Sequence, residues 1–118
     1  MYEDWAEQFR VLGDATRLRI LMLLGIRDAC VCELAAVLPV SQPAVSQHLR
    51  RLKQAGLVVE YRQKSWMFYR LRPDLPEHVR RWLADMPVDP GDAAWLRTHH
   101  AEAACGLASA SDPVRPTN

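Results

Sequence analysis

The sequence predicts a mainly α-helical fold with a small β-hairpin, the arrangement called a winged helix-turn-helix. Three observations indicate it. Apolar residues recur at helical spacing through most of the 118 residues. The segment LVVEYRQKSWMFYRL is instead rich in β-branched and aromatic residues and breaks at RQKS. A short turn, PVSQP, joins the two helical segments that precede this β-hairpin. The expected order is α-α-α-α-β-β-α-α.

Helix start and stop signals give the first four helices. The amphipathic segment EDWAEQFRVL predicts a helix over residues 3–12. Asp14 can cap a second helix, ATRLRILMLL, which we expect to stop at Gly25 and to form the centre of the core. A short third helix is expected over residues 31–38, before a proline. Ser41 is a good cap for a fourth helix that runs to about residue 55.

In the second half of the chain, the spacing of apolar residues changes from that of a helix to that of strands and then returns to that of a helix. The two arms of the hairpin are expected over Leu57–Tyr61 and Trp66–Leu71, with a basic tip between them. PEHVRRWLADM predicts a fifth helix, PVDPGD a loop, and AAWLRTHHAEAACGLA a last helix. The tail SASDPVRPTN is small, polar and proline-containing, which is typical of flexible segments.

Charge is segregated along the chain. The segment from Ser41 to Arg72 carries seven basic residues and one acidic residue, Glu60, for a formal charge of +6. The other residues carry eight basic and 13 acidic side chains, for a charge of −5. Surface arginines can simply keep helices soluble, but they need not then gather in one third of the sequence. The pattern favours a surface that binds a polyanion such as DNA.

The predicted fourth helix has one apolar face and one polar face. Val45, Leu49 and Leu52 lie within about 60° of one another at 100° per residue, so they face the core. The N-terminal residues of a recognition helix reach base edges in the major groove of double-stranded DNA. We expect DNA contacts from Ser41, Gln42, Ala44, Ser46, Gln47, His48, Arg50 and Arg51, and from Arg62 and Lys64 at the hairpin tip.

These residue types have distinct expected roles. Glutamine can pair bidentately with adenine and arginine with guanine, whereas serines and helix N-terminal amides suit phosphates. A simpler role stays open for some of these residues. Capping alone accounts for Ser41, helix-start chemistry can account for Gln42 and Ser46, and His48 can serve in capping or packing.

Cys30 and Cys32 flank a single valine just before the helix-turn-helix. Thiolates select soft ions, although free cysteines are also often buried as small apolar residues. In a regular helix, residues two apart point about 200° away from each other. Both sulfurs can therefore hold one ion only if at least Cys30 lies outside the helix, or if the first turn unwinds.

These segments resemble the ArsR–SmtB family of metal-responsive bacterial repressors. VLGDATRLRILMLL is similar to the family's second helix, VCELAAVLPVSQPAVSQHLRRLKQAGLV to its helix-turn-helix, and RQKSWMFYRL to its wing. The most specific feature is CVCEL directly before the helix-turn-helix. It resembles the arsenite-sensing branch, whose motif is Cys-Val-Cys-Asp-Leu-Cys. YRLRPDLP also resembles that branch, and the match covers roughly residues 5–78.

The resemblance implies a homodimer, paired through its first and last helices, that binds a palindromic DNA operator and releases it when an inducer binds. It implies As(III) or Sb(III) as the inducer ligand of Cys30 and Cys32, with no permanent cofactor. The branch's third cysteine falls at Ala35, so Cys105 is the remaining candidate third ligand, from either subunit. We assign residues 1–102 to DNA binding and dimerisation, and residues 103–118 to a flexible tail that carries Cys105.

The expected mechanism couples this pair to DNA. An ion that bridges the two sulfurs would distort the start of the third helix. The fourth helix follows after only a few residues, so its angle would shift and DNA affinity would fall.

Two other sensing chemistries on the same fold stay open. His99 and His100, with Cys105 nearby and His78 upstream, suggest a dimer-interface site for zinc, nickel or cobalt. Adjacent histidines point about 100° apart on a helix, however, which favours solvated side chains. A thiol redox or persulfide sensor would instead pair one of the two close cysteines with Cys105.

The sequence also argues against other classes of protein. It contains no nucleophile–base arrangement, phosphate-binding loop or metal-hydrolase motif, so we expect no enzyme. An adaptor that does not bind DNA would leave the +6 segment unexplained. No apolar run reaches 18 residues, and MYEDWAEQFR is not a signal peptide. Three free thiols fit the reducing cytoplasm, which is the expected location.

Overall fold

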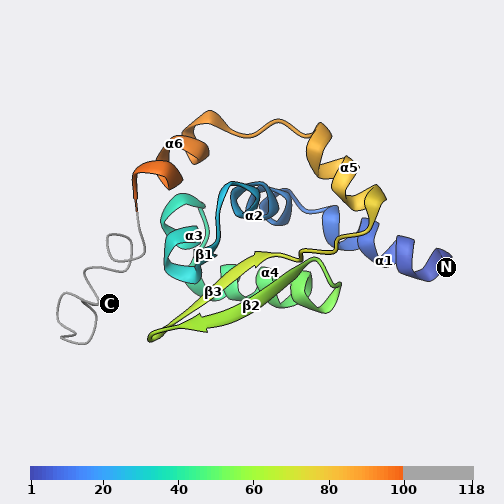
Figure 1. The fold of residues 1–118 in the computed structure, drawn as a ribbon, viewed down its shortest axis with the longest axis horizontal. Coiled ribbons are helices and arrows are strands. Elements are labelled where there is room, and N and C mark those ends of the chain that lie inside the picture. The colour runs from blue at the N-terminus through green and yellow to red at the C-terminus, as the bar shows by residue number, and fades with distance from the viewer. Residues whose placement is uncertain (100–118) are drawn as a thin grey trace.

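The computed structural model describes residues 1–99. Six helices and three strands follow one another in this part of the chain. They are α1 (Tyr2–Leu12), α2 (Ala15–Ile26), β1 (Ala29–Cys30), α3 (Val31–Val37), α4 (Gln42–Gln54), β2 (Val58–Gln63), β3 (Trp66–Leu71), α5 (Glu77–Asp85) and α6 (Pro90–Thr98). In Figure 1, α2 lies in the middle, α1 and α5 share one end, and α6 lies at the other end beside α3. The predicted winged helix-turn-helix, mainly helical with a small hairpin, is confirmed.

The sheet has one strand more than the sequence predicted. β1 pairs antiparallel with β3, which also pairs with β2, so the strand order is β1-β3-β2. The register joins Ala29 to Tyr69 and Cys30 to Phe68. A strand of two residues has no detectable alternation, and its partner lies about forty residues further along the chain. The extra strand matters because it places a cysteine in the same sheet as the hairpin.

The second helix is longer than predicted. Instead of stopping at Gly25, α2 continues to Ile26, and the backbone N–H of Arg27 still donates to the carbonyl of Leu23. Its start was predicted correctly, because the Asp14 carboxylate accepts a hydrogen bond from the backbone N–H of Arg17 at 3.0 Å. That backbone hydrogen bond is the largest influence that lowers the pKa of Asp14.

The last helix was predicted with the wrong bounds. It begins at Pro90 rather than Ala93, because Asp89 caps it by accepting from the backbone N–H groups of Gly91 and Asp92. It ends at Thr98, where the next residue turns extended, although the predicted helix ran through both histidines. The remainder of that prediction, the tail and the third cysteine lie outside the described residues.

The core forms around α2. The predicted inner face of α4 is confirmed, because Val45, Leu49 and Leu52 are fully buried against it. α6 is fixed to α2 by a bidentate ion pair, in which Arg19 donates to both oxygens of Asp92 at 2.7 Å. None of the helices in residues 1–99 has the length and hydropathy of a membrane span.

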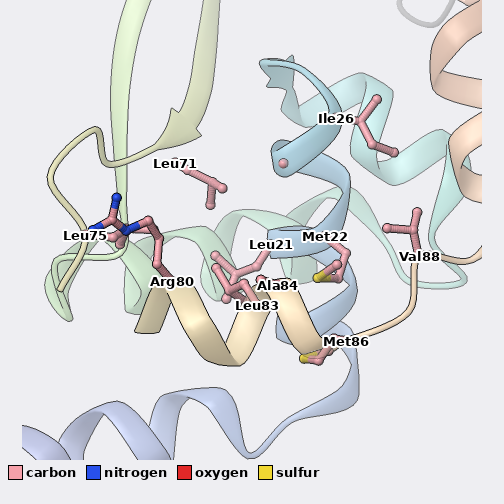
Figure 2. A pocket seen from close by; sticks show the side chains of 11 residues that line it. Leu21, Met22, Ile26, Leu71, Leu75, Arg80, Leu83, Ala84, Met86 and Val88 are labelled. Carbon is pink, nitrogen blue, oxygen red and sulfur yellow. The ribbon is translucent and has the colours of Figure 1, made fainter. Parts of the chain in front are cut away.

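An apolar pocket lies between α2, α5 and the segment that leads from α5 to α6 (Figure 2). Leucine, methionine and valine side chains line most of it, including Met22, Met86 and Val88, and Arg80 is the one charged residue that lines it. No residue of α3 or α4 lines this pocket. It is therefore separate from the cysteine pair and from the predicted DNA-reading helix.

Candidate DNA interface and cysteine pair

The predicted recognition helix, α4, begins with a side-chain cap. Ser41 is the N-cap, and its hydroxyl accepts from the backbone N–H of Ala44 at 3.3 Å. Capping is therefore a sufficient role for Ser41, with or without DNA. Of the predicted contact residues on this segment, Ser41, Gln42, Gln47, Arg50 and Arg51 are exposed, and Ala44, Ser46 and His48 are half-buried.

The basic residues of this region divide into two kinds. Lys53 pairs with Glu60 at 2.9 Å, and this hydrogen bond lowers the pKa of the Glu60 carboxyl. Arg72 pairs with an aspartate and donates to a backbone carbonyl. Within residues 1–99, the predicted DNA-contacting arginines Arg50, Arg51 and Arg62 form no ion pair with an acidic side chain. Their charges are left for a partner such as phosphate.

His48 lies against the second helix. Its Nδ1 is 3.3 Å from Nη1 of Arg17, which itself donates to the carbonyl of Val11 at 2.6 Å. The side chain is half-buried. This contact supports the packing role that the sequence left open for His48 beside DNA contact.

The tip of the hairpin is shorter than expected. β2 continues to Gln63, so Arg62 is an exposed residue of a strand rather than of a loop. Lys64 turns the chain with a positive φ of 59°, next to Ser65. Both predicted basic residues still lie at the far end of the hairpin, exposed to solvent.

Cys30 belongs to two elements at once. It is the last residue of β1 and the N-cap of α3, with extended backbone angles of φ −96° and ψ 170°. Cys30 therefore lies outside the helix, which is one of the two conditions that the sequence set for both sulfurs to hold one ion. The residue is 4% exposed, and it forms a capping box with the fully buried Glu33, whose carboxylate accepts from the Cys30 backbone N–H at 3.0 Å.

Cys32 lies in the first turn of α3 and is half-buried. The side-chain amide of Gln42 donates to its sulfur at 3.5 Å, within the distance allowed for a hydrogen bond to sulfur. Cys32, together with Trp66 and Phe68 of β3, packs against Cys30 in a small cluster separate from the main core. Cys32 therefore contacts α4, and Cys30 packs against the hairpin.

A partly buried ion pair ties the start of α3 to the end of α6. Arg27 donates to the Glu33 carboxylate at 2.7 Å, to the carbonyl of Leu96 at 3.0 Å and to the carbonyl of His99 at 2.6 Å. One guanidinium thus joins the residue that caps the cysteine pair to the last described residue of the chain. The sequence did not predict this connection.

The histidines do not gather into a site. His78 stacks on Trp5 with ring centroids 3.9 Å apart, and its Nε2 lies 2.6 Å from the side-chain oxygen of Gln8. His99 stacks on Trp95 at the other end of the molecule. Across residues 1–99, no group of three or more histidine, cysteine or acidic side chains is placed to hold a metal ion. His100 and Cys105 lie outside this range.

Some of the contacts around the cysteines have a signal in the sequence, and one has none. The spacing from Cys30 to Glu33 is that of a capping box, with cysteine in place of serine. The alternation of Trp66 and Phe68 in a strand predicts a shared face, but not what that face covers. The contact of Gln42 with Cys32 depends on how α3 and α4 pack, which spacing alone does not reveal.

Comparison with known proteins agrees with this architecture. The family model of bacterial regulatory proteins of the arsR family matches residues 14–60. The arsenic resistance transcriptional regulator ArsR1 of Pseudomonas putida is 42% identical over 89 residues, which cover 75% of this chain and 68% of that protein. The arsenical resistance operon repressor of Escherichia coli is 40% identical over 88 residues, or 74% and 68% of the two chains. The solved structure of reduced HlyU from Vibrio cholerae has a TM-score of 0.62 at 29% identity, with 70% and 84% covered.

Proposed function

Because this chain belongs to the arsR family and is a DNA-binding transcriptional repressor rather than an enzyme, we propose that it senses As(III) or Sb(III) through Cys30 and Cys32. Ion binding at this pair lowers the affinity of α4 and the hairpin for the operator. The observation that carries the proposal is the contact between Cys32 and Gln42 at the start of α4.

The chemistry of the pair suits a soft, thiophilic ion. Two thiols outside any disulfide lie close together in the sequence, with one residue between them, in a cluster with two aromatic side chains. Cys30 stands outside the helix, so its sulfur is not held on the opposite side from that of Cys32 by helical geometry. Thiolates prefer soft ions over hard cations such as magnesium.

Cys105 of the same subunit is the third ligand in this proposal. Arg27 joins the carbonyl of His99 to the carboxylate of Glu33, which in turn accepts from the backbone N–H of Cys30. Cys105 follows six positions after His99, and an extended chain of that length spans at most about 20 Å. The anchoring of His99 and this reach support Cys105 as the third ligand, since Ala35 supplies no thiol of its own.

The proposed release follows from what the chain's own residues do. Cys30 and Cys32 turn their sulfurs toward a common ion, so the capping box at the start of α3 is disturbed. The Gln42 amide loses its sulfur acceptor, and the N-terminus of α4 is freed to tilt. A 100-fold loss of operator affinity corresponds to about 2.7 kcal/mol, and DNA weakens ion binding by the same factor.

A homodimer on a palindromic operator completes the proposal. Tyr2 and Phe9 of α1 are 80% and 55% exposed, and Trp5 packs against Trp82 of α5. An exposed apolar face of this kind is typical of a protein interface. Two recognition helices related by two-fold symmetry would read two half-sites in successive major grooves, within the cytoplasm where the DNA lies.

Thiol oxidation or a divalent ion is the second candidate signal. Neither Cys30 nor Cys32 forms a disulfide within residues 1–99, so a redox or persulfide sensor would use the same position. The separation of His78 from His99 makes a histidine site for a divalent ion the weaker alternative.

The test is operator release by defined inducers. The apo protein first selects its operator from random-sequence DNA, and fluorescence anisotropy then follows binding of that labelled duplex. We expect arsenite to release the duplex at lower concentration than zinc, nickel, peroxide or polysulfide. Release by peroxide or polysulfide alone would contradict metalloid sensing. X-ray absorption of the arsenite complex should show three sulfur neighbours, and two after Cys105→Ser.

A further inference from the structure

The cysteine pair is built into the sheet that forms the wing, here meaning the hairpin of β2 and β3. Cys30 of β1 lies directly opposite Phe68 of β3, and Phe68 lies directly opposite Tyr61 of β2. Paired residues of neighbouring strands share a face, so these three side chains form one row across the sheet. Figure 1 shows β1 beside α3, with the wing extending from the same sheet.

A hydrogen bond also joins the outer strand of this row, β2, to the residue just before β1. The hydroxyl of Tyr61 donates to the Asp28 carboxylate at 2.6 Å, across the intervening strand β3. Asp28 is two residues before Cys30, on the same face of an extended chain. Burial, followed by this hydrogen bond, raises the pKa of Tyr61 to about 12, so the hydroxyl stays protonated and able to donate.

Aromatic packing connects the cysteines with the rest of the wing. Tyr61 stacks on Phe68 with ring centroids 5.8 Å apart, and Trp66 contacts Phe68 at 6.5 Å. Trp66 and Phe68 in turn pack against Cys30, as does Cys32. A displacement of the Cys30 sulfur therefore shifts side chains of the wing as well as Cys32 of α3.

We propose that the state of the cysteine pair sets the position of the wing through the row Cys30–Phe68–Tyr61, with Tyr61 as the positioning residue that fastens the wing to β1. This inference rests on the proposed function, because it requires an ion at Cys30 and Cys32. It adds a second effect of ion binding at the cysteine pair: the wing leaves the DNA together with the recognition helix.

The physical reason is that the Cys30 sulfur is buried among side chains of the wing. The residue is 4% exposed and packs against Trp66 and Phe68, so a rotation about χ1 that brings its sulfur toward Cys32 displaces those side chains. β1 has only two residues, and its ladder with β3 is correspondingly short. The hydrogen bond of Tyr61 with Asp28 is then a side-chain tie between the wing and the residue just before β1, beside the packing of Trp66 and Phe68 on Cys30.

The first test asks whether the wing contacts DNA in both states. Duplex affinity is measured by anisotropy with and without saturating sodium arsenite, for the wild type and for the double variant Arg62→Ala, Lys64→Ala. Without arsenite, we expect the double variant to bind about tenfold more weakly, with a reduced salt dependence. With arsenite, the two proteins should bind equally within about twofold, because the wing has already left the DNA.

The second test addresses the positioning residue. Tyr61→Phe keeps the ring that stacks on Phe68 but removes the bond to Asp28. We expect the ratio of duplex affinities without and with arsenite to fall at least about threefold. Tyr69→Phe is the matched control, because the Tyr69 hydroxyl bonds to Glu60 within the hairpin and not to β1. Its ratio should stay within about twofold of the wild type.

The outcomes separate this inference from the proposed function. If arsenite does not release the duplex from the wild-type protein, both are wrong. If arsenite releases the duplex but the Arg62 and Lys64 substitutions cost the same in both states, only the wing inference is wrong. It is also overturned if these substitutions cost nothing without arsenite, or if the Tyr61 and Tyr69 variants behave alike.

Discussion

The carboxylate of Glu33 accepts a hydrogen bond from the backbone N–H of Cys30 at 3.0 Å, while its other oxygen binds Arg27 at 2.7 Å. Glu33 has no exposed surface. One buried side chain thus caps α3 at the proposed inducer site and, through Arg27, holds the end of α6. The start of α3 is consequently a junction of several elements, and a change there reaches further than one helix turn.

Glu33→Ala tests this junction. The substitution leaves the Arg27 guanidinium without its carboxylate and the Cys30 N–H without its acceptor, so we expect a loss of about 3 kcal/mol in unfolding free energy. Urea denaturation at a fixed protein concentration measures it. Glu77→Ala is the control, because Glu77 forms exposed ion pairs with Arg80 and Arg81. It should cost less than about 1 kcal/mol, and equal losses in both variants would contradict the junction.

Gln42→Ala should weaken the link between the thiols and the recognition helix. The variant lacks the amide that contacts the Cys32 sulfur, so arsenite should change its duplex affinity less than it changes that of the wild type. Gln47→Ala is the comparison on the same helix, since Gln47 is exposed and lies more than one helical turn beyond Gln42. It should weaken binding by a similar factor with and without arsenite. Anisotropy titrations of both variants in the two states measure these effects.

Asp14 should contribute an acid-dependent part of the stability. Because its folded-state pKa is lowered from 3.8, its contribution is present above about pH 4 and is lost as the pH falls through the folded pKa. Asp14→Ala should cost about 1 kcal/mol at neutral pH as a lost helix cap. Asp14→Asn should keep the cap but flatten the acid dependence, as measured by urea midpoints from neutral pH down to about pH 3. A wild-type slope in the asparagine variant would contradict this assignment.

Tyr61 should make the stability of the fold depend on pH in the alkaline range. Its folded-state pKa of about 12 exceeds the ordinary value of 10.0, so its stabilising contribution is complete below pH 10 and is lost as the pH rises toward 12. The urea midpoint of the wild type should therefore fall more steeply above pH 10 than that of Tyr61→Phe. Burial also raises the pKa of Tyr69, but this residue is present in both proteins, so its contribution cancels in the comparison. Parallel slopes would show that the Tyr61–Asp28 bond does not stabilise the fold.

Local patterns were enough to predict much of the fold. The apolar period of α4 identified Val45, Leu49 and Leu52, all fully buried, and the change of period identified the wing. The position of Cys30 outside α3 also agrees with the condition derived from helical geometry. Each of these features depends on residues close together in the sequence.

Features that depend on distant residues were missed. β1 exists because Ala29 and Cys30 meet β3, and Arg27 reaches carbonyl groups about seventy residues further along the chain. The start of α6 was different, because Asp89 followed by proline is a recognisable helix start that periodicity alone does not reveal. The aromatic surroundings of the cysteines required the packed sheet, not the spacing of residues.

The sulfurs of Cys30 and Cys32 together control operator binding in the proposed function. An arsenite titration of the selected, fluorescently labelled duplex bound to the wild type, to Cys30→Ser and to Cys32→Ser tests this directly. We expect all three proteins to bind the duplex within about threefold of one another without arsenite, and only the wild type to release it at low micromolar arsenite. Release from either serine variant at the wild-type arsenite concentration would show that the two sulfurs do not act together.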